Sequence, residues 1–326
     1  MMQANSISSR AEAGSLPGGP SLENRRTAVP CSPAAAVLAR LTDFTSLTKQ
    51  RVTVLVVITA WLGYALGAAG LPAAAKPGWL GWLVTLTGTG LACMGAAALN
   101  QVIERGPDSR MQRTRSRPIP AGRLSARNGT LLGLALSAAG VGVLAIAGHL
   151  VAAMVCLVTI LLYVMVYTPM KRVHWSATLI GAVPGALPPV IGYAVATGTI
   201  GPAAWAVFAL MFAWQMPHFM AIAWLYRDDY ARGGFPFLAV VDPSGRSTFR
   251  QMLLWAAALL PIGAAPWWLG FAGPFYLLGA SVAGMAFLLL ALMLVNHRSL
   301  LMARATFYAS LIYLPVVLVL MVADHV

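Results

Sequence analysis

The sequence contains few charged side chains, and very few of them are acidic. Only 10% of its 326 residues are Asp, Glu, Lys or Arg, with 9 acidic residues against 22 basic ones. A soluble domain carries about 25% charged residues, so this deficit argues against a soluble globular protein. The formal net charge of +13 leaves two interpretations, nucleic-acid binding or the basic bias of loops in a membrane protein, and the positions of the basic residues can separate them.

Cysteine is scarce as well. The three cysteines, Cys31, Cys93 and Cys156, form no Cys-x-x-Cys pair, and the last two lie in apolar runs. This pattern argues against a zinc site or a disulfide framework and favours buried thiols.

Long apolar runs make up most of the chain, which is 59% hydrophobic. Runs of about 18–25 residues are long enough for a helix to cross about 30 Å of hydrocarbon. We predict an all-α polytopic membrane protein with about nine transmembrane helices. The predicted spans are 52–71, 79–103, 128–147, 149–168, 175–196, 202–225, 251–272, 275–295 and 303–323. Prolines inside several spans, among them Pro184, Pro188 and Pro315, predict kinks.

The first 40 residues differ in composition from the rest. They are rich in Ser, Pro, Gly and Ala and lack an apolar stretch long enough for a signal peptide. We predict a disordered N-terminal tail over 1–40 and a nine-helix transmembrane domain over 41–326. A mitochondrial transit peptide is the alternative, weakened by Glu12 and Glu23 and by the lack of a clear amphipathic helix.

The basic residues alternate with the predicted spans. Every Lys and Arg except Lys76 falls in the N-terminal segment or in the second, fourth, sixth or eighth loop. Because Lys and Arg gather on the cytoplasmic side of a membrane, this distribution places the N-terminus in the cytoplasm or matrix and the C-terminus outside. The charge therefore requires no nucleic acid, and we expect none as a partner.

A polar stretch closes the second span. Asn100, Glu104 and Asp108 are spaced i, i+4, i+8 and share one helical face, unless Pro107 ends the helix and leaves Asp108 on a loop. Oxygen ligands beside several arginines suit a magnesium-bound diphosphate, since Mg²⁺ takes carboxylate and phosphate oxygens and Arg binds phosphate directly. A helix end capped by solvated, topology-setting arginines is the simpler alternative.

The sixth span and its loop carry a second polar group. Gln215 and His218 lie in an otherwise apolar span, and the acidic pair Asp228 and Asp229 follows on the same side of the membrane. A histidine within the membrane is a candidate functional residue. The alternative is a histidine that only hydrogen-bonds between helices.

Taken in order, these motifs resemble the UbiA-type intramembrane prenyltransferases. The first signature runs from Asn100 to Asp108 and continues to Arg123. Three further segments resemble the haem O synthase branch of that superfamily: Leu47-Thr-Lys49-Gln-Arg51-Val-Thr, Tyr167-Thr-Pro-Met-Lys171-Arg172, and Trp214-Gln-Met-Pro-His218-Phe219 followed by Tyr226-Arg-Asp-Asp229-Tyr230. The similarity covers residues 41–325.

Two departures from the superfamily pattern bear on its metal chemistry. Glu104 stands where many members have Asp. Arg232 stands four residues after Asp228, so the DxxxD motif of the quinone prenyltransferases is missing. The second departure favours the haem branch and leaves the number of Mg²⁺ ions open.

The resemblance implies a UbiA-like fold, with nine helices around a central cavity that opens to the membrane. It also implies transfer of a farnesyl group from farnesyl diphosphate to a vinyl group of haem B, giving haem O and diphosphate. Membrane lipids and, downstream, haem A synthase are the other partners it suggests.

The resemblance further implies roles for individual residues. Mg²⁺ is the expected cofactor, and His218 would ligate the haem iron or act on protons near the vinyl group. The expected catalytic and metal-binding residues are Asn100, Glu104 and Asp108, with His218 as a further catalytic residue; the expected diphosphate-binding residues are Lys49, Arg51, Arg113, Arg117, Lys171 and Arg227; and Asp228, Asp229 and Tyr230 form the second polar loop.

Two other functions stay open at this point. They are a related prenyltransferase that acts on a quinone or chlorin precursor, and a transporter of haem or lipid that performs no chemistry. The short tail without a convincing presequence favours the bacterial cytoplasmic (inner) membrane over the mitochondrial inner membrane.

Overall fold

The computed structural model describes residues 33–326, which are helical and contain no β-strand. The predicted fold class is confirmed. In chain order the elements are α1 Pro33–Leu47, α2 Gln50–Ala69, η1 Ala73–Ala75, α3 Trp79–Arg110, α4 Ala126–Ile146, α5 Leu150–Leu161, η2 Leu162–Tyr167, α6 Thr168–Met170, α7 Ala177–Ala186, α8 Pro188–Thr197, α9 Pro202–Leu225, α10 Arg227–Gly233, α11 Leu238–Val241, α12 Arg246–Trp268, α13 Pro274–His297 and α14 Leu300–Ala323.

Nine helical segments in the described part of the chain are long and apolar enough to cross a membrane. Seven are the single helices α2, α3, α4, α9, α12, α13 and α14, and two are composite. The fourth span joins α5, the π-helical segment η2 and α6, and the fifth joins α7 and α8. The fifth divides at Leu187, just before Pro188, where a proline was expected to kink the span. The predicted number of spans is confirmed.

The second span is longer than predicted, because α3 continues past 103 to Arg110 with Pro107 inside it. Proline has no N–H to donate to the carbonyl four residues earlier, which here belongs to Ile103. The Arg172 guanidinium, from the loop after α6, donates to that carbonyl instead. The helix therefore survives the proline and keeps Asp108 on the same face as Glu104.

Most of the predicted tail over 1–40 lies outside the described residues, so its disorder stays a prediction. Its last residues belong to α1, which begins at Pro33. Residues 42–326 form one compact unit, to which the following description applies.

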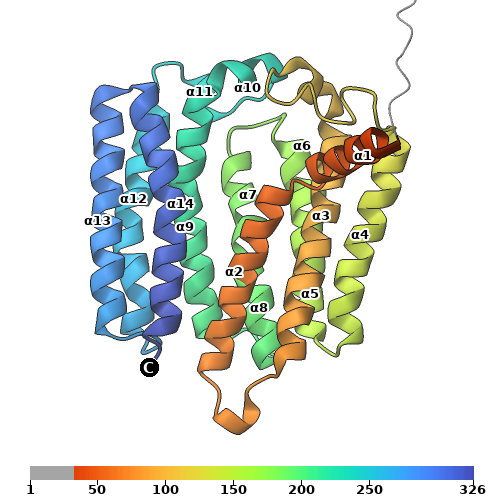
Figure 1. Ribbon diagram of the computed structural model, residues 1–326. Helices are drawn as coiled ribbons and strands as arrows, with labels where there is room; N and C mark the ends of the chain where they lie inside the picture. The colour runs from red at the N-terminus through yellow and green to blue at the C-terminus, as the bar shows by residue number, and fades with distance from the viewer. Residues whose placement is uncertain (1–32) are drawn as a thin grey trace, which may run out of the picture. The chain divides into compact units, whose positions relative to one another are not determined.

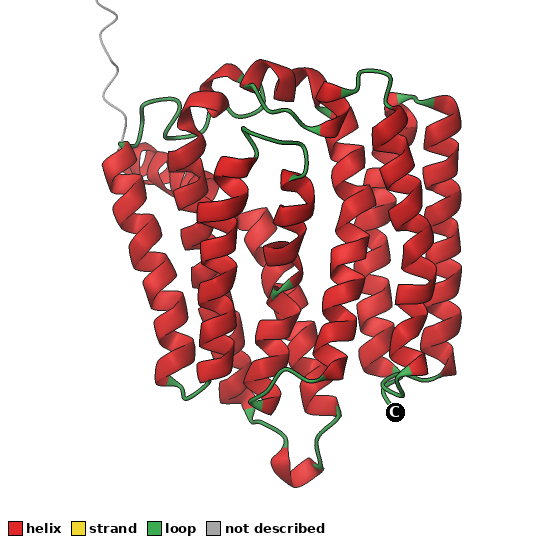
Figure 2. Cartoon of the chain, turned by 180° about the vertical axis from the view of Figure 1, so that it is seen from behind, coloured by secondary structure: helices red, strands yellow, loops and turns green. Residues whose placement is uncertain are grey.

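The spanning helices of this unit lie side by side as a bundle (Figures 1 and 2). Neighbouring pairs include α2 with α3 and α8, α3 with α4, α9 with α12 and α14, and α13 with α12 and α14. Glycines allow the closest approaches: a Cβ on Gly192 of α8 would collide with the Ala60 carbonyl oxygen of α2, and a Cβ on Gly63 of α2 would collide with the backbone of Pro189. Such small-residue contacts are the usual means of packing helices in a membrane.

The two ends of the unit differ. The loop after α3 and the short helices α10 and α11 cover one end, while η1 and the C-terminus lie at the other (Figure 1). Glu104 and Asp108, in the last turns of α3, therefore lie at the covered end.

Candidate active site

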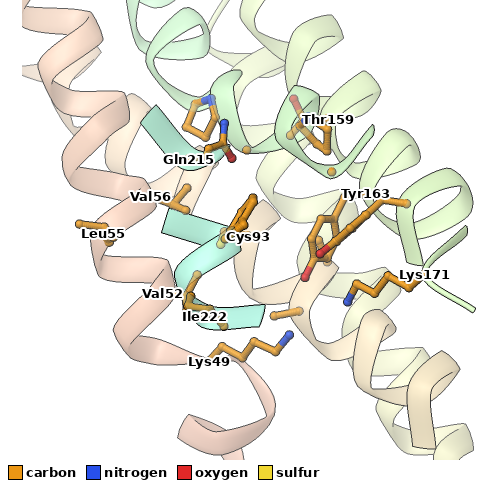
Figure 3. Close-up of a pocket in the computed structure, with 18 of the residues that line it drawn as sticks. Lys49, Val52, Leu55, Val56, Cys93, Thr159, Tyr163, Lys171, Gln215 and Ile222 are labelled. Atoms are coloured by element: carbon orange, nitrogen blue, oxygen red, sulfur yellow. The ribbon is translucent and has the colours of Figure 1, made fainter. Parts of the chain in front are cut away.

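A cavity of about 490 Å³ lies between the spanning helices. Its wall is mostly apolar, with contributions from α2, α3, α5, α7, α9 and α14. Figure 3 shows the side chains of Lys49 and Lys171 at one end, and those of Gln215 and Thr159 toward the other. The cavity is thus amphipathic, with a charged mouth and an apolar interior.

Two carboxylates of α3 form the acidic part of the mouth. Glu104 and Asp108 are one helical turn apart, both are buried and both line the cavity. Lys171 Nζ lies 2.7 Å from Glu104 Oε1, and Arg117 Nη1 lies 2.7 Å from Asp108 Oδ2. Each of the two acids is thus paired with a basic residue from a different loop.

Lys49, the residue just before α2, lines the mouth of the cavity. Its backbone is left-handed, with φ 48°, an uncommon conformation for a residue with a side chain. Its Nζ donates to Asn100 Oδ1 at 2.8 Å, and Asn100 Nδ2 donates to Thr168 Oγ1 at 3.1 Å. Asn100 is fully buried and does not line the cavity, but it contacts Lys49, which does.

The two lysines of the mouth differ in basicity. Burial, together with the positive charges of Arg117 and Lys171, lowers the pKa of Lys49 to about 7. Burial would also lower the pKa of Lys171, but the Tyr167 ring and the Glu104 carboxylate raise it above its ordinary value. The Lys171 ammonium lies 4.5 Å from the centroid of that ring. Lys171 is therefore a fixed cation, while Lys49 can lose its proton near neutral pH.

The donor set of the mouth fits a magnesium ion that is shared with a diphosphate. Asp108 Oδ1 is buried without a hydrogen-bond partner, although Oδ2 of the same carboxylate is paired with Arg117. Within residues 33–326 no group of three or more His, Cys, Asp or Glu side chains could hold a metal ion by itself. Two carboxylates suffice for Mg²⁺ when phosphate oxygens and water supply the remaining ligands.

Asp229, in α10, fixes the loop that covers the mouth. Its carboxylate accepts hydrogen bonds from the backbone N–H groups of Gln112 (2.8 Å) and Arg113 (3.2 Å) and from Arg232 Nη2 (2.6 Å). Burial alone would raise the pKa of Asp229, but these hydrogen bonds hold it below its usual value. The Arg113 side chain, placed over the Tyr230 ring at 5.5 Å, lines the cavity.

The structure does not bring all of the predicted residues together. Arg227 lies 4.4 Å from the Trp224 ring and 3.6 Å from the exposed carboxylate of Asp228, and neither Arg227 nor Asp228 lines the cavity. Arg51 is exposed and is also absent from the cavity wall. Arg51 and Arg227 were expected at the mouth as diphosphate ligands because of their motifs, and Asp228 was expected in the second polar loop. None of the three side chains lines the cavity.

His218 lines the cavity from α9. Its Nδ1 is 2.7 Å from Ser310 Oγ of α14, and its ring is 5.2 Å from that of Trp214 and 5.0 Å from that of Phe307. His218 is therefore held by a second helix and still faces the cavity.

The structure adds residues that the sequence did not single out. Thr168 supports Asn100, Ser310 supports His218, and Tyr163 and Tyr167 form the wall beside Lys171. Thr168 and Tyr167 are part of the Tyr-Thr-Pro-Met-Lys motif, so the sequence gave some indication that they lie near the site. Nothing in the sequence marked Ser310 as a site residue, because a lone hydroxyl in an apolar span usually forms a hydrogen bond within its own helix.

The fold and the site together define an intramembrane enzyme for substrates with an anionic head and an apolar body. Residues 56–314 match the model of the UbiA prenyltransferase family, and the chain belongs to this family. It is a multi-pass membrane protein and a prenyltransferase.

Curated relatives cover nearly the whole chain. One from Solibacter usitatus, named protoheme IX farnesyltransferase, is 43% identical over 292 residues, which are 87% of this chain and 98% of the relative. One of the same name from Koribacter versatilis is 42% identical over 304 residues, which are 90% and 96% of the two chains.

Solved structures share the fold at low sequence identity. A structure described for digeranylgeranylglyceryl phosphate synthase superposes with a TM-score of 0.72 at 13% identity, over 88% of this chain and 98% of that one. A UbiA homolog from Archaeoglobus fulgidus bound to GPP and Mg²⁺ gives 0.56 at 14% identity, over 86% and 99%.

Proposed function

We propose that this chain transfers the farnesyl group of farnesyl diphosphate to a vinyl group of haem B, producing haem O and diphosphate. The single observation that carries the proposal is the mouth of the cavity, where two buried carboxylates and three cations meet above an apolar interior. The names of the curated relatives supply the farnesyl donor and the haem acceptor.

The charged mouth suits the diphosphate. Lys49, Lys171 and Arg117 all present cations to the cavity, and Arg113 lies beside them. In a site largely shielded from water, such cations stabilise the negative charge that grows on the leaving oxygen as the carbon–oxygen bond breaks. These four residues are the proposed diphosphate ligands.

Glu104 and Asp108 would hold Mg²⁺, and Asn100 would add its amide oxygen once the Lys49 ammonium turns to the phosphates. When bound, the ion neutralises charge on the departing diphosphate. The partnerless Asp108 Oδ1 supports this assignment, because a buried carboxylate oxygen is costly to leave unpaired.

The apolar interior suits the farnesyl chain and its reactive carbon. As the bond from C1 to diphosphate breaks, the vinyl π electrons form the new carbon–carbon bond. The positive charge then rests on the vinyl carbon beside the porphyrin and is discharged by water, which loses a proton. Apolar side chains along the wall keep bulk water from capturing the allylic cation before the vinyl group reacts.

We further infer that the protein lies in a bacterial cytoplasmic membrane with its N-terminus in the cytoplasm. The gathering of Lys and Arg on one side supports this orientation. Farnesyl diphosphate would then reach the charged mouth from the cytoplasm, and haem O would pass to an enzyme that oxidises it, such as haem A synthase.

One assay tests the reaction. Purified protein in lipid nanodiscs is incubated with haem B, radiolabelled farnesyl diphosphate and Mg²⁺, and the products are separated by chromatography. Labelled haem O is expected. Label in an added quinone acceptor instead of haem, or haem binding without any labelled product, would refute the proposal and favour one of the two other functions.

A further inference from the structure

Ser310 determines which nitrogen of His218 carries the proton. Ser310 Oγ lies 2.6 Å from the Phe307 carbonyl oxygen and 2.7 Å from His218 Nδ1. A hydroxyl has one proton, and the carbonyl can only accept. Ser310 therefore donates to Phe307 and accepts from His218, so Nδ1 is protonated and Nε2 keeps its lone pair.

The imidazole ring is also fixed in direction. The rings of Trp214 and Phe307 lie near it with interplanar angles of 25° and 30°. Trp214 is itself tied to α14, because its Nε1 donates to the Ser310 carbonyl oxygen at 2.7 Å. The His218 ring is thus held by α9 and α14 together, and its Nε2 has no hydrogen bond to any residue of the described chain.

His218 lies between the two ends of the cavity. On α9 it follows Gln215, near the apolar end, and precedes Ile222, near Lys49 (Figure 3). Ile222 follows His218 by four positions, which is about 6 Å along the helix axis. A flat molecule inside the cavity would therefore contact the His218 ring below the charged mouth.

We propose that Ser310 is a positioning residue that holds His218 as the Nδ1–H tautomer, so that Nε2 ligates the iron of the bound porphyrin. The proposal deepens the proposed function and rests on it, since it requires haem in this cavity. A hydrogen-bonded Nδ1–H is the usual support of a metal-ligating histidine.

The same contacts argue against His218 as a proton acceptor. A histidine that takes up a proton becomes cationic and is stabilised by an anionic partner at its other nitrogen, as in hydrolase triads. Here that partner is a neutral hydroxyl whose own proton is already given to a carbonyl. A neutral ligand fits this environment better than an imidazolium.

Haem binding without farnesyl diphosphate tests the proposal. The full chain in nanodiscs is titrated with haem B and followed by absorption and electron paramagnetic resonance spectra. We expect a nitrogen-ligated iron in the wild type, its loss in His218→Ala, and its return when imidazole is added. Ser310→Ala should weaken haem binding about 10–100-fold, and Ser310→Thr, which keeps the hydroxyl, should bind like the wild type.

Ser137→Ala is the matched control. Ser137 is also a buried serine of a spanning helix, and its side chain packs against Gly95. Size-exclusion chromatography and thermal melting report whether each variant is folded.

Three results would overturn the inference. The first is an unchanged iron spectrum in His218→Ala, and the second is haem affinity in Ser310→Ala within about twofold of the wild type. The third is an equal loss of affinity in Ser137→Ala. The proposed function fails separately, when wild-type protein ligates haem through His218 and forms no farnesylated product.

Discussion

The buried pair of Glu104 and Lys171 should dominate the stability of the mouth. Lys171 Nζ and Glu104 Oε1 are 2.7 Å apart, and both side chains are largely buried. At an effective dielectric constant of about 20, the attraction between two such charges is about 6 kcal/mol. Desolvation cancels part of this attraction, so the pair itself contributes far less than removal of one partner costs.

Lys171→Met should therefore destabilise the protein by about 3–5 kcal/mol, because it leaves the Glu104 carboxylate buried without its cation. Glu104→Gln should cost less, since the Lys171 ammonium keeps its contact with the Tyr167 ring. The double variant Glu104→Gln/Lys171→Met has neither uncompensated charge. Its loss should fall short of the sum of the single losses by about 1–3 kcal/mol.

Denaturant titration of the four proteins in one detergent measures this double-mutant cycle, and the farnesyl transfer assay is run on the same samples. The double variant should be stable yet inactive, which separates the structural role of the pair from its role in catalysis. Additive losses would refute the reasoning, because they would mean that the two charges do not interact.

Asp108→Asn should lower turnover at least about 10²-fold while the protein stays folded, because the proposed Mg²⁺ loses one of its two charged ligands and no longer stabilises the leaving diphosphate as well; wild-type rates would contradict the metal assignment. Gly192→Ala should destabilise the protein, since its Cβ meets the Ala60 carbonyl of α2, whereas Gly142→Ala, with open space around its Cβ, should be neutral or slightly stabilising in the same melting experiment. With a pKa of about 7, Lys49 is charged below that pH and neutral above it. Inorganic pyrophosphate should therefore bind the wild type more weakly as the pH rises through 7, beyond the change that the ionisation of pyrophosphate itself causes. Calorimetry on Lys49→Met should lack this component, and identical pH profiles in the two proteins would exclude it.

The spans and the shared face of Glu104 and Asp108 could be predicted because both follow from local periodicity. Nine apolar runs and an i, i+4 spacing need no knowledge of tertiary contacts. The end of α3 could not be predicted in this way. Pro107 leaves the Ile103 carbonyl without its helical donor, and the Arg172 guanidinium, from a loop more than 60 residues away, donates to that carbonyl instead.

The partners within the site were beyond prediction for the same reason. Arg113 and Arg227 both follow a span in a recognisable motif, yet Arg113 lines the cavity while Arg227 packs on Trp224. The contact of Ser310 with His218 depends on how α14 packs against α9, two helices far apart in the sequence. Residue types predicted the chemistry of the mouth, but only packing decides which of the basic residues take part.

Arg232 explains in structural terms why the second acidic motif is missing. A DxxxD pair would place a second carboxylate where Arg232 stands, four residues after Asp228. Arg232 instead pairs with Asp229, and that carboxylate also accepts two backbone N–H groups of the loop after α3. With its oxygens engaged in this way, Asp229 is suited to holding the loop, and hence Arg113, over the cavity rather than to binding a second metal ion. The acidic groups that face the diphosphate are then Glu104 and Asp108 of α3, so these two carboxylates are the ones that would hold a metal ion beside the leaving group.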